Sequence, residues 1–311
     1  MSNREKIHLT ESERIRRLTL PEGRLDIVLD TDTYNEVDDQ FALAYALLSP
    51  DRLNVQAIYA APFYNDRSSG PADGMQRSYD EILRFLSKLS ISADGLVYKG
   101  SDSYLPGADI PVDSPAARDL VARAMARPEG DLLYVIAIGA ITNVASALLM
   151  EPRIAEKIAI IWLGGHPTTY PNTYEFNLSQ DVPAARVVLD SGAPVTLVPC
   201  LQVASHMLTT VAELESCIGG KNDLCDSLIE NVRGFTSNHF GCAKEIWDVA
   251  TIGYMIDPGC LPSKLVHSPL LTDDFRWAHD ESRHFIRECV CCFRNPIFTD
   301  MFEKLSKVRD Q

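Results

Sequence analysis

The sequence lacks the features that place a chain in a membrane or on a nucleic acid. Its strongest apolar run, residues 158–165, ends in glycines and a histidine, well short of the roughly 20 residues that a membrane helix needs. The first residues are charged and have no apolar centre of the kind found in secretory signals. No run of Lys and Arg offsets the formal net charge of −14, so a nucleic-acid polymer is a poor partner. We therefore expect a soluble, cytoplasmic protein with neither a membrane nor a nucleic-acid partner.

Metal-binding cysteine pairs and interdomain linkers are also missing. The eight cysteines include no C-x-x-C pair, and the tightest group, ECVCC at residues 288–292, lies in an apolar, strand-like stretch. Such cysteines usually pack as small apolar residues, and reduced thiols are typical of the cytoplasm. No linker rich in Pro, Gly or Ser and no internal repeat interrupts the chain. We expect a charged N-terminal segment (1–22) followed by one α/β domain (23–311).

The sequence does contain a regular alternation of short β-branched runs and helical stretches. Strands are expected at residues 25–30, 53–61, 96–100, 132–139, 158–165 and 193–199, and helices at 38–48, 74–89, 114–126, 141–150 and 181–192. From about residue 200 the pattern becomes mostly helical (212–233, 244–256 and 296–308), with one or two strands between. Repeated strand–helix units predict a mainly parallel, Rossmann-like open sheet with helices on both faces and a helical C-terminal portion.

Carboxylates gather where the first of these strands ends. The stretch LDTDTYNEVDDQFALAYAL (29–47) carries Asp30, Asp32, Glu36, Asp38 and Asp39. Like charges so close together raise one another's pKa and oppose folding unless something positive offsets them, and a bound cation is the simplest candidate. Polar loops follow other predicted strands as well, and in open parallel sheets ligands bind beyond the carboxyl ends of the strands. This edge of the sheet is therefore the predicted site.

The acidic stretch allows three metal hypotheses. An EF-hand counted from Asp30 fails, because Asn35 and Phe41 stand where the motif needs Gly and Glu. The run VLDTDT resembles the haloacid dehalogenase phosphatases, which would make Asp30 a nucleophile and Mg²⁺ the cofactor, although the later motifs of that family have no convincing match. The third hypothesis is a site for calcium or another hard cation made from Asp32, Asp38 and Asp39, with oxygens from other strand ends completing the shell.

A set of motifs in order resembles the inosine-uridine preferring nucleoside hydrolases. The fingerprint DTDTYNEVDDQFAL is followed by VYKGSDSYLPG, IGAITNVASALLMEP, IIWLGGH, YEFNLSQDVPAARVVLDSG and IWDVATIGYMIDP, which together cover about residues 25–257. The resemblance implies hydrolysis of the N-glycosidic bond of a ribonucleoside to a free base and ribose, with Ca²⁺ as cofactor. It also implies a homodimer or homotetramer.

The resemblance also implies roles at individual positions. The calcium ligands would be Asp32, Asp39, Asp248 and the main-chain carbonyl of Thr142, and Asp32 would in addition take a proton from the attacking water. The residues that hold sugar hydroxyls would be Asp38, Glu175, Asn177, Asn65 and Asn172, although the spacing around the last two differs from the family pattern.

Two departures from the family pattern bear on function. Five residues, rather than three, separate Asp32 from the Asp38–Asp39 pair, so this loop is longer. Trp247 precedes Asp248 at a position where many family members have a histidine that protonates the leaving base. A tryptophan at this position is similar to the purine-preferring branch of the family. We expect Trp247 to be a catalytic residue that stacks on a purine, with Tyr64, Arg67, His166 and His239 as further candidates near the base. A divergent protein that binds nucleosides without cleaving them stays an alternative.

Overall fold

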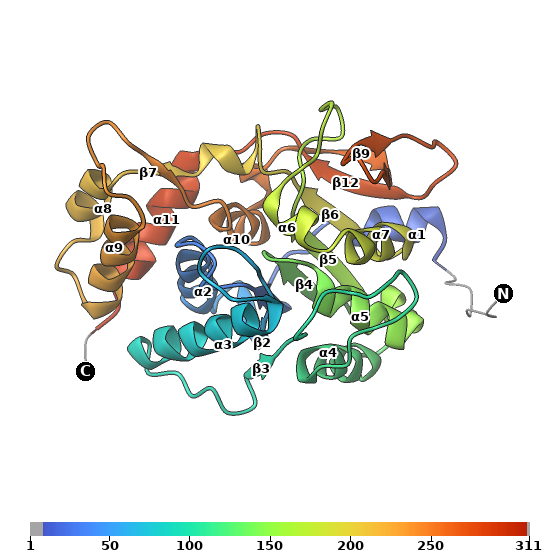
Figure 1. Cartoon of the computed structure of the whole chain (residues 1–311), viewed down its shortest axis with the longest axis horizontal. Coiled ribbons are helices and arrows are strands. Elements are labelled where there is room, and N and C mark those ends of the chain that lie inside the picture. The colour runs from blue at the N-terminus through green and yellow to red at the C-terminus, as the bar shows by residue number, and fades with distance from the viewer. Residues whose placement is uncertain (1–8, 310–311) are drawn as a thin grey trace.

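Residues 9–309 of the computed structural model are described here, and they form a central sheet flanked by helices (Figure 1). The sheet has eight strands in the order β3-β2-β1-β4-β5-β6-β12-β9. In chain order its strands are β1 (Leu25–Thr31), β2 (Leu53–Ala60), β3 (Val97–Lys99), β4 (Leu133–Ala137), β5 (Ile158–Leu163), β6 (Val195–Val198), β9 (Ser263–His267) and β12 (Phe285–Cys289). All neighbouring pairs are parallel except β12 with β9. The predicted mainly parallel α/β fold is confirmed.

The helices cover both faces of this sheet. They are α1 (Glu11–Arg17), α2 (Asp39–Leu47), α3 (Pro71–Lys88), α4 (Pro115–Met125), α5 (Thr142–Met150), α6 (Phe176–Gln180), α7 (Val182–Asp190), α8 (Val211–Ile218), α9 (Asp223–Phe235), α10 (Val249–Ile256) and α11 (Arg294–Ser306). Short 3-10 turns lie at Pro152–Glu156, Ala204–His206 and Pro258–Cys260. None of the helices in the described range is both long enough and apolar enough to cross a bilayer.

Two apolar cores, one on each face, hold the helices against the sheet. Ile27 and Leu29 of β1 pack into one core together with residues of α2, α3 and α8 to α11. Val28 points the other way, into the core formed with α4, α5 and α7. Because side chains alternate along a strand, a strand covered on both faces must be apolar at nearly every position. This is why residues 27–29, in the middle of the strand, are all apolar and stand between Asp26 and Asp30.

The C-terminal third departs from the predicted long helices in two places. The expected helix 212–233 is two helices, α8 and α9, because the chain breaks at Gly219–Gly220. The expected helix 244–256 begins only at Val249, because Lys244–Glu245 forms a strand (β8) that pairs with β7 (Leu208–Thr209). A second small ribbon joins β10 (Leu270–Leu271) to β11 (Trp277–Ala278). All eight cysteines are free thiols, and five of them are buried, as their apolar neighbours suggested.

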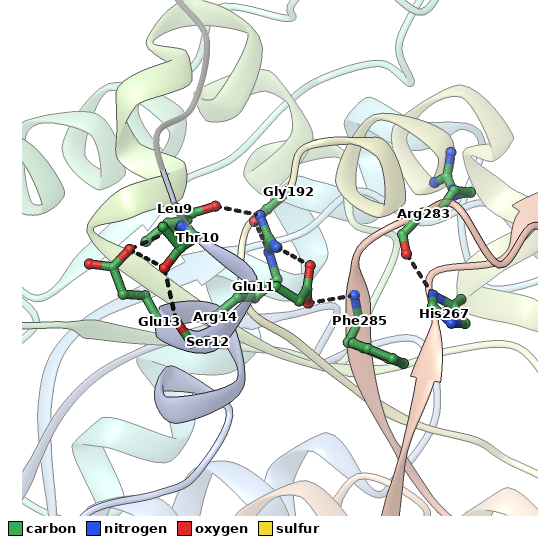
Figure 2. Close-up of polar contacts among 10 residues, drawn as sticks. All are labelled: Leu9, Thr10, Glu11, Ser12, Glu13, Arg14, Gly192, His267, Arg283 and Phe285. Carbon is green, nitrogen blue, oxygen red and sulfur yellow. Dashed lines mark hydrogen bonds and ion pairs between the residues drawn. The ribbon is translucent and has the colours of Figure 1, made fainter.

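The N-terminal segment docks onto the far end of the sheet through α1 (Figure 2). Thr10 and Glu13 form a capping box at the start of the helix. The Glu11 carboxylate accepts a hydrogen bond of 2.9 Å from the main-chain N–H of Phe285 in β12, and buried Arg14 donates to the carbonyl of Gly192 at 2.8 Å. The part of the predicted charged segment within residues 9–22 is therefore tied to the sheet by these polar contacts.

Candidate active site

The carboxyl ends of β1, β4, β5 and β6 meet at one edge of the sheet around a cavity of about 240 Å³. Its lining includes most of the polar residues predicted for the site, together with apolar residues from β4, β5 and the loops that follow them. The lining residues are Asp32, Asn35, Glu36, Asp38, Asp39, Ile138, Leu163, His166, Glu175, Phe176, Asn177, Cys200, Leu201, Trp247 and Asp248. The cavity thus lies at the edge of the sheet where the strand-end rule predicts a ligand site.

The acidic loop brings three aspartates, as well as Glu36, into this cavity despite its two extra residues. β1 ends at Thr31 and α2 begins at Asp39, with Asp38 as its N-terminal cap residue. The intervening loop turns back on itself, since the N–H of Asn35 donates to the carbonyl of Asp32 at 2.7 Å. Asp32, Asp38 and Asp39 are all buried and all line the cavity.

Asp248, the N-terminal cap residue of α10, lies close to the aspartates of the loop between β1 and α2 although it is far from them in the sequence. One carboxylate oxygen from each of Asp38, Asp39 and Asp248 lies within 4.8 Å of the others, close enough for one cation to contact all three. Among residues 9–309 this is the one group of three or more such side chains with that geometry. The grouping includes Asp38, which the resemblance assigned to sugar binding, and leaves Asp32 beside the triad.

The negative charges of these carboxylates are not balanced by nearby positive charge. Burial raises the pKa of Asp32, Asp39 and Asp248 well above the usual value, and repulsion between the carboxylates adds to the shift. Burial and the charge of Glu36 raise the pKa of Asp38 to about 6. Both oxygens of Asp32 are buried without a hydrogen-bond partner, which is costly for a carboxylate. Such a set of hard oxygen donors fits a calcium ion.

Lys244 is a charged neighbour of the cluster that the sequence did not reveal. Its Nζ lies 2.5 Å from Glu36 Oε2, and its side chain is 13% exposed. Burial alone would lower the pKa of Lys244, but the charges of Asp38 and Glu36 outweigh burial and hold it above the ordinary value. Because 208 residues separate Lys244 from Glu36, no local pattern could have predicted this pair.

Glu175 and Asn177 enter the cavity from the loop that follows β5. Glu175 caps the start of α6, and its carboxylate accepts the N–H groups of Gly165, Asn177 and Leu178 at 2.7, 2.9 and 3.0 Å. The side-chain amide of Asn177 donates to the carbonyls of Ile138 and Leu163 at 3.3 and 3.1 Å, which fixes it between the ends of β4 and β5. Both residues therefore occupy the cavity in defined orientations.

Three predicted site residues do not line the cavity. The hydroxyl of Thr142 donates to Asp181 at 2.7 Å, and the residue of this strand end that reaches the cavity is Ile138. Asn172 is exposed, and its side chain accepts the N–H of Tyr174 in a local turn. Asn65 does not line the cavity itself, but its side-chain amide donates a hydrogen bond of 2.6 Å to Asn35, which does. Thr142 and Asn172 therefore lie outside the cavity lining in which the resemblance placed them, and a main-chain carbonyl or a turn-forming asparagine leaves no distinct signal in the sequence.

Apolar and aromatic side chains also line the cavity. They include Trp247, which is half-buried, Leu201, Phe176 and, with its imidazole, His166. Of the further candidates, only His166 reaches the cavity, since His239 lies on an exposed loop and Tyr64 is 56% exposed. Arg67 lies nearby, donating to the carbonyl of Glu36 at 3.3 Å.

Asp30, the nucleophile in the phosphatase hypothesis, lies outside the cavity. It is fully buried, and its carboxylate accepts a hydrogen bond of 2.7 Å from the side-chain amide of Asn143. Burial raises the pKa of Asp30 to about 7, with the Asn143 hydrogen bond acting in the opposite direction. A phosphate ester in the cavity would not meet this carboxylate, so the geometry argues against that hypothesis.

Comparison with known proteins gives one consistent family. The sequence model of a family described as "Inosine-uridine preferring nucleoside hydrolase" matches residues 27–285. A pyrimidine-specific ribonucleoside hydrolase of Escherichia coli is 29% identical over 167 residues, which are 49% of this chain and 53% of that protein. The match thus spans about half the length of this curated relative.

Solved structures of nucleoside hydrolases share the fold. A plant nucleoside hydrolase is 19% identical with a TM-score of 0.73, and the match covers 91% of this chain and 99% of that one. A purine-preferring ribonucleoside hydrolase from Gardnerella vaginalis is 21% identical with a TM-score of 0.71, covering 91% and 98%. An inosine-guanosine nucleoside hydrolase is 19% identical with a TM-score of 0.73, covering 92% and 100%.

Proposed function

The chain belongs to the inosine-uridine preferring nucleoside hydrolase family, and on this premise we propose that it is a calcium-dependent N-ribohydrolase of purine ribonucleosides. The observation that carries the proposal is the grouping of Asp38, Asp39 and Asp248 within 4.8 Å, with unpartnered Asp32 lining the same cavity. Gly139 adds to the fit, because a Cβ at this position would lie 3.0 Å from Asp32 Cγ and would crowd that carboxylate.

The proposed cation site consists of Asp38, Asp39 and Asp248, with Asp32 beside them and the carbonyl of Ile138 in place of that of Thr142. Bound there, the ion would supply Lewis-acid chemistry by holding sugar hydroxyls and lowering the pKa of a water. Asp32, whose two carboxylate oxygens have no protein partner, would take a proton from the attacking water. Glu175 and Asn177 would orient the sugar.

The carboxylates also match the charge that the reaction creates. Breaking an N-glycosidic bond builds positive charge on the ribose and negative charge on the departing base. Negative charge next to the sugar stabilises the first of these. The base would lie in the apolar part of the cavity, where Trp247 would stack on it, and stacking on an aromatic ring is worth about 1 to 3 kcal/mol per base.

The preference for purines rests on Trp247. The curated relative is pyrimidine-specific and two of the structural neighbours are named for purine nucleosides, so these names do not choose between bases. The larger face of a purine gains more from an indole than a pyrimidine does. The cytoplasmic location, the single domain over residues 23–311 and an assembly of two or four copies remain further parts of the proposal.

A substrate panel tests the proposal. The protein is incubated with inosine, guanosine, adenosine, uridine and cytidine, and separately with 4-nitrophenyl phosphate, with calcium or with a chelator. We expect free base and reducing sugar from the purine nucleosides, with calcium only. Release of phosphate would favour the phosphatase hypothesis, and calcium-dependent binding without any free base would favour the non-catalytic alternative.

A further inference from the structure

His166 is held in the cavity by a tight turn at the end of β5. The chain passes from Leu163 through two glycines, and Gly165 has a φ of +65°, in the left-handed region. A Cβ on Gly165 would lie 2.6 Å from Thr173 Oγ1 and 3.0 Å from Trp277 Cζ2, so no larger residue fits. The turn therefore depends on glycine, and it places His166 in the wall of the cavity.

Two hydrogen bonds fix the backbone of His166. Its N–H donates to Thr173 Oγ1 at 2.9 Å, and its carbonyl accepts from the indole N–H of Trp277 at 2.9 Å. Trp277 is itself 8% exposed, so the anchor is well packed. A side chain whose backbone is held from both sides keeps a defined position, as a group that must meet a substrate requires.

The imidazole ring has one nitrogen available to a ligand. Nδ1 is enclosed by protein and has no hydrogen-bond partner, so a molecule in the cavity can meet only Nε2. Burial lowers the pKa of His166, against the opposing effect of the Gly165 and Tyr174 carbonyls. The other titratable groups in the lining are carboxyls and the buried Cys200 thiol, whose pKa burial raises well above its usual value.

We propose that His166 is the catalytic acid that donates the Nε2 proton to the base as it leaves, an assignment that rests on the proposed ribohydrolase function. Two observations support this assignment. His166 lines the cavity without belonging to the acidic cluster, and two hydrogen bonds fix its backbone. A group that loses its proton readily suits this task, and general acid catalysis is typically worth roughly 10² to 10⁴ in rate.

The step balances without any further reactant. The bond between C1′ and the base nitrogen breaks, its electron pair goes to the base, and the Nε2 proton of the His166 imidazolium moves onto the base and leaves a neutral imidazole. The oxygen of water bonds to C1′ and its proton goes to Asp32. Free base and ribose leave, Asp32 releases its proton to solvent, and His166 regains one from solvent.

Two substrates that share ribose but differ in their leaving groups test this role. Inosine needs a proton on its departing base, whereas the nitrophenolate of 4-nitrophenyl β-D-ribofuranoside leaves without one. His166→Ala and the shape-conserving His166→Gln are compared with wild type and with His279→Ala, a change at an exposed histidine outside the cavity. Melting temperatures are measured for all four proteins, each with calcium present.

The two His166 variants should lose roughly 10² to 10³ in kcat/KM for inosine and keep the nitrophenyl riboside rate within about threefold. His279→Ala should match wild type on both substrates. A loss of less than about threefold on inosine, or an equal loss on both substrates in His166→Gln, would overturn the assignment. Wild type that cleaves the nitrophenyl riboside but no nucleoside would also overturn it while leaving the ribohydrolase chemistry intact. Wild type inert towards both substrates would overturn the proposed function and the assignment with it.

Discussion

Replacing Asp38 by asparagine should make the calcium-free protein more stable, because it removes one of the mutually repelling carboxylates. Burial raises the pKa of Asp38 from 3.8 to about 6, so the native state holds this proton more tightly than the unfolded chain. The free energy of unfolding therefore falls as the pH rises from about 4 to 6, and the loss is complete above 6. At about 1.4 kcal/mol per pH unit, the cost of ionising Asp38 is about 3 kcal/mol at pH 8.

The melting temperature in a chelator measures this cost directly. At pH 8 the Asp38→Asn protein should melt roughly 5 °C above wild type, and at pH 4 the difference should nearly vanish. Adding calcium at a thousandfold excess over Kd should reverse the order, because only wild type keeps the full donor set and gains about 4.1 kcal/mol, more than the cost of Asp38. Asp51→Asn, a change at an exposed carboxylate that does not line the cavity, is the matched control and should show neither effect.

The diagnostic result is that Asp38→Asn is more stable than wild type in the chelator and less stable than wild type in calcium. If Asp38→Asn is less stable than wild type in the chelator at pH 8, repulsion within the cluster is not what raises the free energy of the native state. If both proteins gain equally from calcium, Asp38 does not belong to the ion site.

Three further changes test other parts of the structure. Trp247→Ala should lower kcat/KM for inosine by roughly 10- to 100-fold, and Trp247→Phe should lower it by less, since the smaller ring keeps part of the stacking. Unchanged inosine turnover in Trp247→Ala, together with loss of activity in Asp248→Ala, would refute the stacking role. Lys244→Met should lower the free energy of unfolding by about 3 kcal/mol in urea titrations with chelator at pH 8, because Glu36 loses its buried partner. An unchanged urea midpoint would show that the Lys244–Glu36 pair does not offset the charge of the acidic cluster. Burial and the nearby charges of Arg14 and Arg283 lower the pKa of His284 to about 4, so protonation of this one group should remove up to about 3 kcal/mol of stability as the pH falls from 6.5 to 4, against the gain from Asp38. His284→Gln should lose correspondingly less over this range, and identical pH profiles of the two proteins would contradict the shift.

Much of the fold follows from features that are local in the sequence. The apolar centre of β1 and the alternation of strands and helices predicted a mainly parallel sheet with helices on both faces, and the strand-end rule pointed to the edge where the cavity lies. The C-terminal third was predicted less well, because β8 pairs with β7 across 35 residues that separate Leu208 from Lys244. Short strands whose partners are distant leave little periodicity to detect.

The site shows the same division between local and distant information. Asp32, Asp38 and Asp39 could be named because carboxylates at the end of the first strand are visible in the sequence, and Asp248 could be named from the family resemblance. Lys244 and Ile138 could not, since one acts through a partner far along the chain and the other reaches the cavity as an apolar residue whose carbonyl any residue would carry. Thr142 was chosen over Ile138 because main-chain carbonyls cannot be told apart in the sequence.

The rate of inosine hydrolysis during calcium titration of chelator-treated protein tests the central claim most directly. The account predicts no base release without added calcium and a rate that rises to saturation as a single site fills, with Asp248→Asn inactive throughout. A wild-type rate that does not depend on calcium, or no release of hypoxanthine at saturating calcium, would contradict it.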